Sequence, residues 1–366
     1  MDDRSSVLVI SQLPPPVTGS TLMTEVLVAV LESTHSVTTV QRRFSTSVDE
    51  IGRFRWSKVI AAPRLVGSVV SSVLRRRPHV AILFVTNRPF SFVVDVAVAT
   101  ALRLLGVRTV FYIHTRGFTT LAEKGRVWRV AAEFLFCCAA GVVTLTDSMV
   151  TDVRSLTSRP IWVIPNSPDI RAADSRERRD DDQYILYLSN YLEEKGALDA
   201  IKAVGLAQGK RPSLSLKLHG AGGSLDFHER LMQAREACPF PEQIQIGGPL
   251  DRDQKWGVLQ GSLMLLFPST YAFEAQPLVI IEALSSGVPV VAYDVGSIPD
   301  LVPPAAGRLA PPGSVTELSE RLVELVDTNG PSGAYSRGAR AQYEQVHSRA
   351  AYAENWKIVL DAVTAL

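Results

Sequence analysis

Two glutamates, Glu274 and Glu282, lie eight residues apart in the stretch FPSTYAFEAQPLVIIEALSSGVPVV. The pattern predicts a helix over Leu278–Ser285, so that Glu274 precedes the helix and Glu282 lies inside it. Carboxylate oxygens accept hydrogen bonds from vicinal sugar hydroxyls. Free backbone amides at the start of the helix, around Pro277–Ile280, favour a phosphate, although Pro277 itself has no N–H. This stretch is therefore a candidate site for a ligand that carries both hydroxyls and phosphate.

Short apolar runs alternate with amphipathic segments along the whole chain. In the first half, buried strands are predicted at Val7–Ile10, Val80–Val85, Thr109–Ile113 and Gly141–Leu145. In the second half, they are predicted at Tyr184–Leu188, Ser213–Leu218, Gln243–Ile246, Leu263–Phe267, Pro289–Tyr293 and Gly307–Leu309. This alternation is typical of βαβ units. We therefore expect two doubly wound α/β domains, which bind ligands beyond the carboxyl ends of their strands.

The charged segment RAADSRERRDDDQ, residues 171–183, separates the two series and is predicted to be an exposed linker. Residues 1–168 contain 19 Lys and Arg against 11 Asp and Glu, a balance of +8, whereas the remainder is −7 and the whole chain +1. The basic half indicates either solvated helix faces or an anionic partner, such as a membrane surface or a charged acceptor. Nucleic acid is not expected, because no aromatic-studded basic groove motif accompanies the charges.

The composition, 46% hydrophobic and 20% charged, is that of an ordinary globular chain. Three cysteines are too few and too poorly placed for a disulfide framework, and no His/Cys cluster has zinc spacing. The start, MDDRSSVLVI, opens acidic and enters a strand, so no signal peptide is expected. The longest uncharged apolar stretch is too short to span a bilayer. We expect a cytoplasmic protein, or one peripheral at the inner membrane face.

The sequence around the two glutamates resembles the retaining GT-B glycosyltransferases, specifically glycosyltransferase family 4. That family has two glutamates separated by seven residues, followed by Ala and Gly-x-Pro-Val-Val, here Glu274, Glu282-Ala283 and GVPVV from Gly287. YILYLSNYLEEKG, LKLHGAGG, GSIPDLV and PPPVTGST also resemble family segments. The resemblance implies two Rossmann-like domains facing across a cleft, an acceptor-binding domain at 1–168 and a nucleotide-sugar-binding domain at 169–345. It also implies a C-terminal helix, 346–366, that returns to the first domain.

The same resemblance implies that a sugar is transferred, with retention, from a UDP- or GDP-linked donor to a hydroxyl of a glycan, lipid or small-molecule acceptor. No metal and no cofactor are expected. Glu282 would bind the ribose, Glu274 the donor sugar, and Lys195 the diphosphate, whose charge it would stabilise on the leaving nucleotide. The implied donor-binding residues are Gly19, Asn190, Lys195, Glu274, Pro277, Leu278, Val279 and Glu282. Asn190 departs from the family, which usually has an arginine there.

His114 ends the predicted strand Thr109–Ile113 and is expected at the carboxyl edge of the first sheet. The resemblance implies that this histidine contacts the donor sugar or the reacting centre, so the predicted catalytic set is His114, Lys195 and Glu274. Arg116 is a weaker candidate for binding the acceptor. Asp251 and Asp253 resemble a metal-binding Asp-x-Asp pair, but their position before a helix favours an N-cap.

Three other kinds of protein remain open on the sequence. One is a different GT-B enzyme acting on nucleotide sugars, of the epimerase or phosphorylase type. Another is a dinucleotide-dependent dehydrogenase, although the glycine cluster at Gly220 is weak evidence for a dinucleotide fingerprint. The third is an inactive scaffold that keeps the fold.

Overall fold

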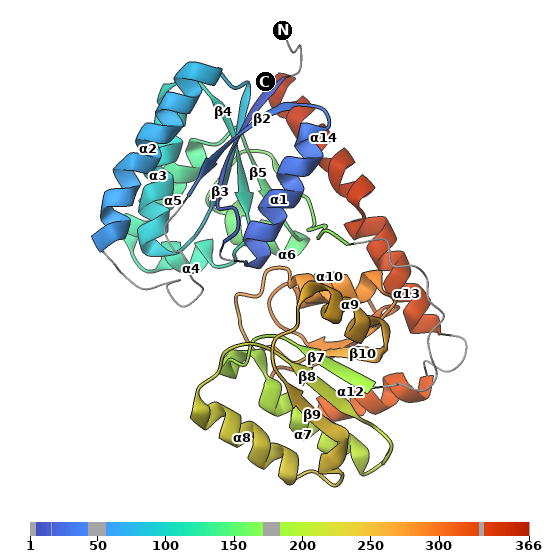
Figure 1. The fold of residues 1–366 in the computed structure, drawn as a ribbon. Coiled ribbons are helices and arrows are strands. Elements are labelled where there is room, and N and C mark those ends of the chain that lie inside the picture. Colours follow the sequence, from blue (N-terminus) through green and yellow to red (C-terminus); the bar gives the residue numbers. More distant parts are fainter. Residues whose placement is uncertain (1–4, 16, 43–55, 171–183, 329–332, 366) are drawn as a thin grey trace. The chain divides into compact units, whose positions relative to one another are not determined.

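The computed structural model describes residues 5–15, 17–42, 56–170, 184–328 and 333–365 of the chain (Figure 1). It divides into two compact units. Unit 1 is Met1–Asp169 together with Ser348–Leu366, and unit 2 is Ile170–His347. The predicted linker, residues 171–183, lies outside the described residues.

Unit 1 contains a parallel sheet in the order β2-β1-β3-β4-β5-β6. Its strands are β1 (Ser6–Ser11), β2 (Ser36–Gln41), β3 (Val80–Val85), β4 (Arg108–Ile113), β5 (Gly141–Thr144) and β6 (Ile161–Val163). β3 is buried along its whole length, as its continuous apolar run predicts. The four strands predicted in this half are therefore confirmed, and β2 and β6 are additional edge strands.

Helices connect and cover the strands of unit 1. They are α1 (Gly19–Glu32), α2 (Trp56–Arg76), α3 (Pro89–Leu104), α4 (Phe118–Glu123), α5 (Arg126–Cys137), α6 (Asp147–Arg154) and α14 (Arg349–Ala365). α14 comes from the C-terminus of the chain and packs against β3 and β4 of unit 1 (Figure 1). Its Trp356 is fully buried and meets Tyr112 of β4 edge to face at 4.9 Å between ring centroids.

Unit 2 contains a second parallel sheet in the order β12-β11-β10-β7-β8-β9. Its strands are β7 (Tyr184–Leu188), β8 (Leu216–His219), β9 (Ile244–Gly247), β10 (Ser262–Phe267), β11 (Val290–Tyr293) and β12 (Gly307–Ala310). All six strands predicted in this half are present, β7 with the predicted bounds and the others with ends that differ by at most three residues.

The helices of unit 2 follow the strands in turn. They are α7 (Ala197–Gln208), α8 (Leu225–Glu236), α9 (Arg252–Gln260), α10 (Leu278–Ser285), α11 (Ile298–Leu301), α12 (Val315–Thr328) and α13 (Ala334–Gln342). Short 3-10 turns stand at Glu193–Lys195 and Pro241–Gln243, and a π-helical turn at Tyr343–His347. Strictly parallel strands joined by helices confirm the doubly wound α/β class for each unit. Within the described ranges, no helix has both the length and the apolar character to cross a membrane.

Candidate active site

The two central strands of the unit 2 sheet, β7 and β10, lie side by side, and the chain leaves them in opposite directions. From β7 it proceeds to β8 and β9, and from β10 to β11 and β12. Ligands of open parallel sheets bind at such a switch point, beyond the carboxyl ends of the strands. Lys195 follows β7 and Glu274 follows β10, so the topology alone brings these two predicted residues to the same edge.

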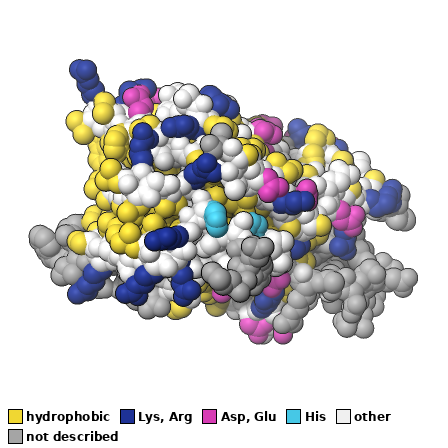
Figure 2. All heavy atoms as spheres, turned by 90° about the horizontal axis from the view of Figure 1, so that it is seen from above, with side chains coloured by type: hydrophobic (Ala, Val, Ile, Leu, Met, Phe, Trp, Pro, Cys, Tyr) yellow, Lys and Arg dark blue, Asp and Glu magenta, His cyan; other side chains and the backbone are white. Residues whose placement is uncertain are grey.

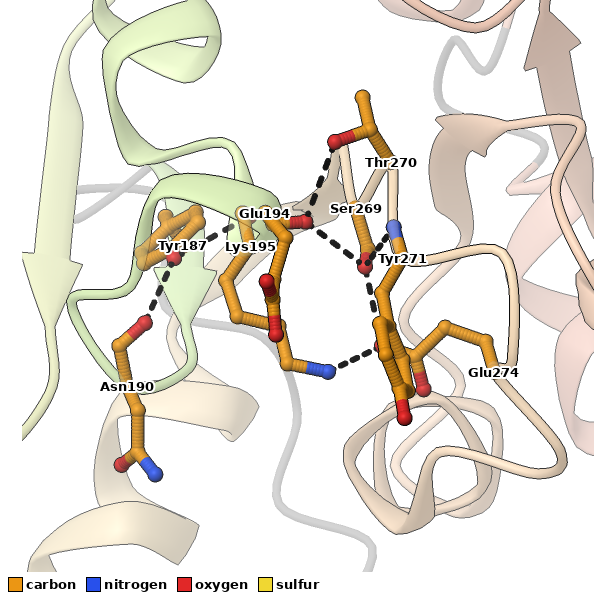
Figure 3. Close-up of polar contacts among 8 residues, drawn as sticks. All are labelled: Tyr187, Asn190, Glu194, Lys195, Ser269, Thr270, Tyr271 and Glu274. Atoms are coloured by element: carbon orange, nitrogen blue, oxygen red, sulfur yellow. Dashed lines mark hydrogen bonds and ion pairs between the residues drawn. The ribbon is translucent and has the colours of Figure 1, made fainter. Parts of the chain in front are cut away.

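Lys195 and Glu274 form an ion pair between Nζ and Oε1 (Figure 3). The Glu274 side chain is 9% exposed and that of Lys195 is 20% exposed. The Lys195 ammonium also lies 5.1 Å from the ring centroid of Tyr271. A cation fixed by a buried carboxylate and an aromatic ring is suited to receive an anionic ligand without large rearrangement.

Contacts between the loops after β7 and β10 hold this pair in place. Ser269 Oγ lies 2.9 Å from Glu274 Oε1 and 3.2 Å from the carbonyl oxygen of Glu194. The backbone N–H of Thr270 donates to the same carbonyl at 2.8 Å, and its hydroxyl lies 3.4 Å from it (Figure 3). Gly196 has φ of +75°, and a Cβ there would lie 1.9 Å from the carbonyl oxygen of Pro268. Only glycine allows the two loops to approach so closely.

Glu282 is also paired with a lysine, one that the sequence analysis did not single out. Lys255 of α9 places its Nζ 2.5 Å from Glu282 Oε1, and the two side chains are 25% and 8% exposed. The sequence offers no local signal for this contact, because the partners lie 27 residues apart on different helices. A carboxylate offers about four lone-pair positions, so Glu282 keeps acceptor capacity beside Lys255.

If Glu282 binds the ribose of a nucleotide, as the resemblance implies, replacing Lys255 by Met should weaken nucleotide binding by about tenfold, because the buried Glu282 carboxylate would lose its counter-ion and its orientation. Calorimetric titration of the nucleoside diphosphate alone measures this effect without turnover. Lys255→Arg keeps the charge and should recover most of the affinity. Equal or tighter binding to Lys255→Met would show that Lys255 competes with the ligand for Glu282.

The start of α10 lies directly after Glu274. Pro277, Leu278 and Val279 are half-buried, and Pro277 is the N-cap. The first backbone N–H groups of an α-helix have no acceptor within the helix, so this end can bind an anion. The backbone of Glu274 is itself held, since the Ser297 N–H donates to its carbonyl oxygen at 3.0 Å.

Asn190, at the position where an arginine was expected from the resemblance, is exposed. Its side chain points away from the Lys195–Glu274 pair (Figure 3), so it supplies neither charge nor contact there. Asp251 is the N-cap of α9 and forms a capping box with Gln254, which confirms the helix-capping interpretation. In the part of the chain that the structure describes, no group of three His, Cys, Asp or Glu residues could hold a metal ion.

His114 belongs to unit 1, directly after β4. Its ring stacks on Phe84 at 5.0 Å and meets the Tyr112 ring at 4.2 Å between centroids. Its Nε2 is buried, with no hydrogen-bond partner among the described residues. Burial lowers the pKa of His114 to about 3, so the imidazole is neutral near neutral pH and can act as a hydrogen-bond partner rather than as a cation.

The loop after His114 is anchored by Asp152, whose carboxylate accepts backbone N–H groups of Gly117, Phe118 and Thr119 at 2.7–3.0 Å. Arg116 donates from its guanidinium to Ser148 Oγ at 3.1 Å. Gly19 is exposed and opens α1, whose N-cap is Thr18.

The buried neutral state of His114 predicts a pH effect on stability. Its pKa is lowered from 6.5 to about 3 on folding, so between these values the unfolded chain binds the extra proton and stability falls as the pH falls. The slope from this group is at most about 1.4 kcal/mol per pH unit. Urea unfolding should be measured at pH 7 and pH 4.5. Between these pH values, the free energy of unfolding should decrease less for His114→Asn than for wild type. An identical loss in both proteins would contradict the buried neutral state.

The chain is similar in sequence to known glycosyltransferases. Residues 169–342 match the family described as glycosyl transferases group 1. An α-D-kanosaminyltransferase of Streptomyces kanamyceticus is 25% identical over 62% of this chain and 63% of its own length. A GDP-mannose-dependent monoacylated α-(1-6)-phosphatidylinositol monomannoside mannosyltransferase of Corynebacterium glutamicum is 26% identical over 55% of this chain and 51% of its own. The chain thus spans between half and two thirds of these relatives.

Two solved structures are similar over almost the whole chain. A glycosyltransferase of Rickettsia africae has a TM-score of 0.77 at 13% identity and covers 99% of both chains. Anabaena HepE in complex with UDP-glucose has a TM-score of 0.71 at 17% identity, over 97% of this chain and 99% of that one. The fold is therefore the two-domain α/β fold of the GT-B glycosyltransferases. The family match covers unit 2, residues 169–342, so this part of the chain has the sequence pattern of the group 1 glycosyltransferases.

Proposed function

We propose that the protein is a retaining transferase that moves a sugar from a UDP- or GDP-linked donor to an acceptor hydroxyl. The observation that carries this proposal is the convergence of Lys195 and Glu274 from the two strands at the switch point of unit 2. HepE, whose fold is similar, is solved with UDP-glucose, and one relative is named as GDP-mannose-dependent. Both names support a nucleotide diphosphate sugar as the donor.

In this proposal, Glu282 accepts hydrogen bonds from the ribose and is oriented by its ion pair with Lys255. Glu274 accepts hydrogen bonds from donor-sugar hydroxyls. Lys195 and the first amides of α10, at Leu278 and Val279, bind the diphosphate. As the bond to the sugar breaks, negative charge accumulates on the leaving diphosphate, and the fixed ammonium of Lys195 stabilises it.

Unit 1 residues have proposed roles in binding the acceptor and the reacting sugar. His114 would hydrogen-bond the reacting sugar through its unpartnered Nε2, Arg116 would contact the acceptor, and Gly19 would let the loop after β1 approach the donor. The proposed acceptor is a hydroxyl of a glycan, lipid or small molecule, and the basic N-terminal half would face an anionic surface.

A donor panel tests this function. The full chain is titrated with UDP-, GDP- and ADP-sugars, and binding and slow donor hydrolysis are measured. We expect the protein to bind and hydrolyse either UDP-sugars or GDP-sugars. Binding of a nicotinamide dinucleotide with no response to any nucleotide sugar would refute the proposal.

A further inference from the structure

Exposed hydrophobic side chains of unit 1 gather on two neighbouring helices, α3 and α5. Val127, Val130 and Phe134 of α5 are 80%, 57% and 45% exposed. Their i, i+3, i+7 spacing places them on one side of the helix. On α3, Val93 and Leu104 are 58% and 82% exposed.

These side chains form one surface because α3 and α5 run parallel and side by side. Near the beginning of both helices, Phe92 meets Trp128 at 6.0 Å between ring centroids. Near their ends, Arg103 donates to the carbonyl oxygen of Cys137 at 2.5 Å. We call the surface the α3–α5 face. It consists of Val93, Ala97, Leu104, Val127, Val130 and Phe134.

Arginines border the α3–α5 face. The exposed charged residues of the two helices are Arg103, Arg126, Arg129 and a single acid, Glu133, and the end of α2 adds Arg75 and Arg76. α2 in turn packs against α3. Figure 2 shows a broad hydrophobic patch bordered by Lys and Arg side chains, on the left, where α2, α3 and α5 lie in Figure 1. An apolar helix face flanked by arginines has the character of a helix lying in a lipid interface.

We propose that the α3–α5 face docks the protein on an anionic lipid bilayer. The apolar side chains would enter the boundary between headgroups and acyl chains, and the arginines would contact lipid phosphates. A second molecule of this protein is a less suitable partner for the α3–α5 face. A symmetric dimer would bring the arginines of the two copies together, and these like charges would repel. The inference rests on the proposed function, since a bilayer is where a lipid-linked acceptor hydroxyl would be met.

Vesicle sedimentation with the full chain tests this docking. We expect binding to phosphatidylcholine vesicles with 30% phosphatidylglycerol, weak binding to phosphatidylcholine alone, and loss of binding at high salt. Val130→Asp should lower the bound fraction strongly. Arg126→Glu with Arg129→Glu should weaken binding by more than about tenfold, at roughly fivefold per arginine removed. Leu225→Asp, on α8 of unit 2 and at an 86% exposed position, is the matched control and should bind like wild type.

Three results would overturn the proposal. They are absence of vesicle binding by the wild-type chain, equal binding by Val130→Asp and wild type, and a wild-type dimer in solution that Val130→Asp converts to monomer. The assay contains no donor, so its failure leaves the transferase proposal standing. Conversely, vesicle binding without any nucleotide-sugar turnover would count against the transferase proposal alone.

Discussion

Lys195→Ala is expected to lower the turnover number for sugar transfer about 100- to 1,000-fold, the usual cost of removing a group aimed at charge in the transition state. The ammonium is held by Glu274 and faces Tyr271, so no other described side chain of this cluster supplies a positive charge in its place. Lys195→Arg keeps the charge and should recover part of the rate. The measurement is steady-state turnover of the preferred donor.

The matched control is Lys202→Ala, an exposed lysine of α7, which should leave turnover unchanged. A double-mutant cycle with Glu274→Gln separates the two roles of Lys195. If Lys195 only orders Glu274, the double variant should be no slower than either single variant, whereas a direct role makes it slower than Glu274→Gln alone. Turnover of Lys195→Ala within threefold of wild type would refute the assigned role.

Trp356→Ala should destabilise unit 1 by about 3–5 kcal/mol, the usual cost of truncating a fully buried Trp. Trp356 is 0% exposed and packs edge to face on Tyr112 and Tyr352, whose hydroxyl oxygens lie 3.3 Å apart. The cavity would lie between α14 and β4. Whole domains are typically stable by about 5–15 kcal/mol, so the variant should be close to unfolding at 37 °C.

Urea unfolding followed by circular dichroism measures this loss, because the substitution itself removes a tryptophan fluorophore. Ile358→Ala is the control on the same helix. Ile358 is 51% exposed, so this change should stay within about 0.5 kcal/mol of wild type. A similar loss for both variants would contradict the claim that burial of Trp356 attaches α14 to unit 1.

In unit 1, the central strands were predictable from the sequence and the edge strands β2 and β6 were not, whereas both edge strands of unit 2, β9 and β12, were predicted. β3 and β10 are buried on both faces, and their sequences are runs of Val, Ile, Leu and other apolar residues. β2, SVTTVQ, lies at one edge of its sheet and is mostly half-buried or exposed, so its run is polar. β6, at the other edge, is only three residues long. Neither edge strand carries the signal that identifies a buried one.

The candidate site was partly predictable for a related reason. Glu274 and Glu282 belong to one local pattern, and Lys195 to another at the end of a strand. The partners Ser269 and Lys255 were not predicted, because their contacts depend on how β7, β10, α9 and α10 are arranged. The exposure of the α3–α5 face could not be predicted from the sequence either, since an amphipathic helix has an apolar stripe whether or not another element covers it.

A crystal structure of the full chain with its preferred nucleotide diphosphate tests the central claim most directly. We expect the diphosphate oxygens within hydrogen-bonding distance of Lys195 Nζ and the first amides of α10, and the ribose hydroxyls on Glu282. A nucleotide bound away from the carboxyl ends of β7 and β10 would contradict the account.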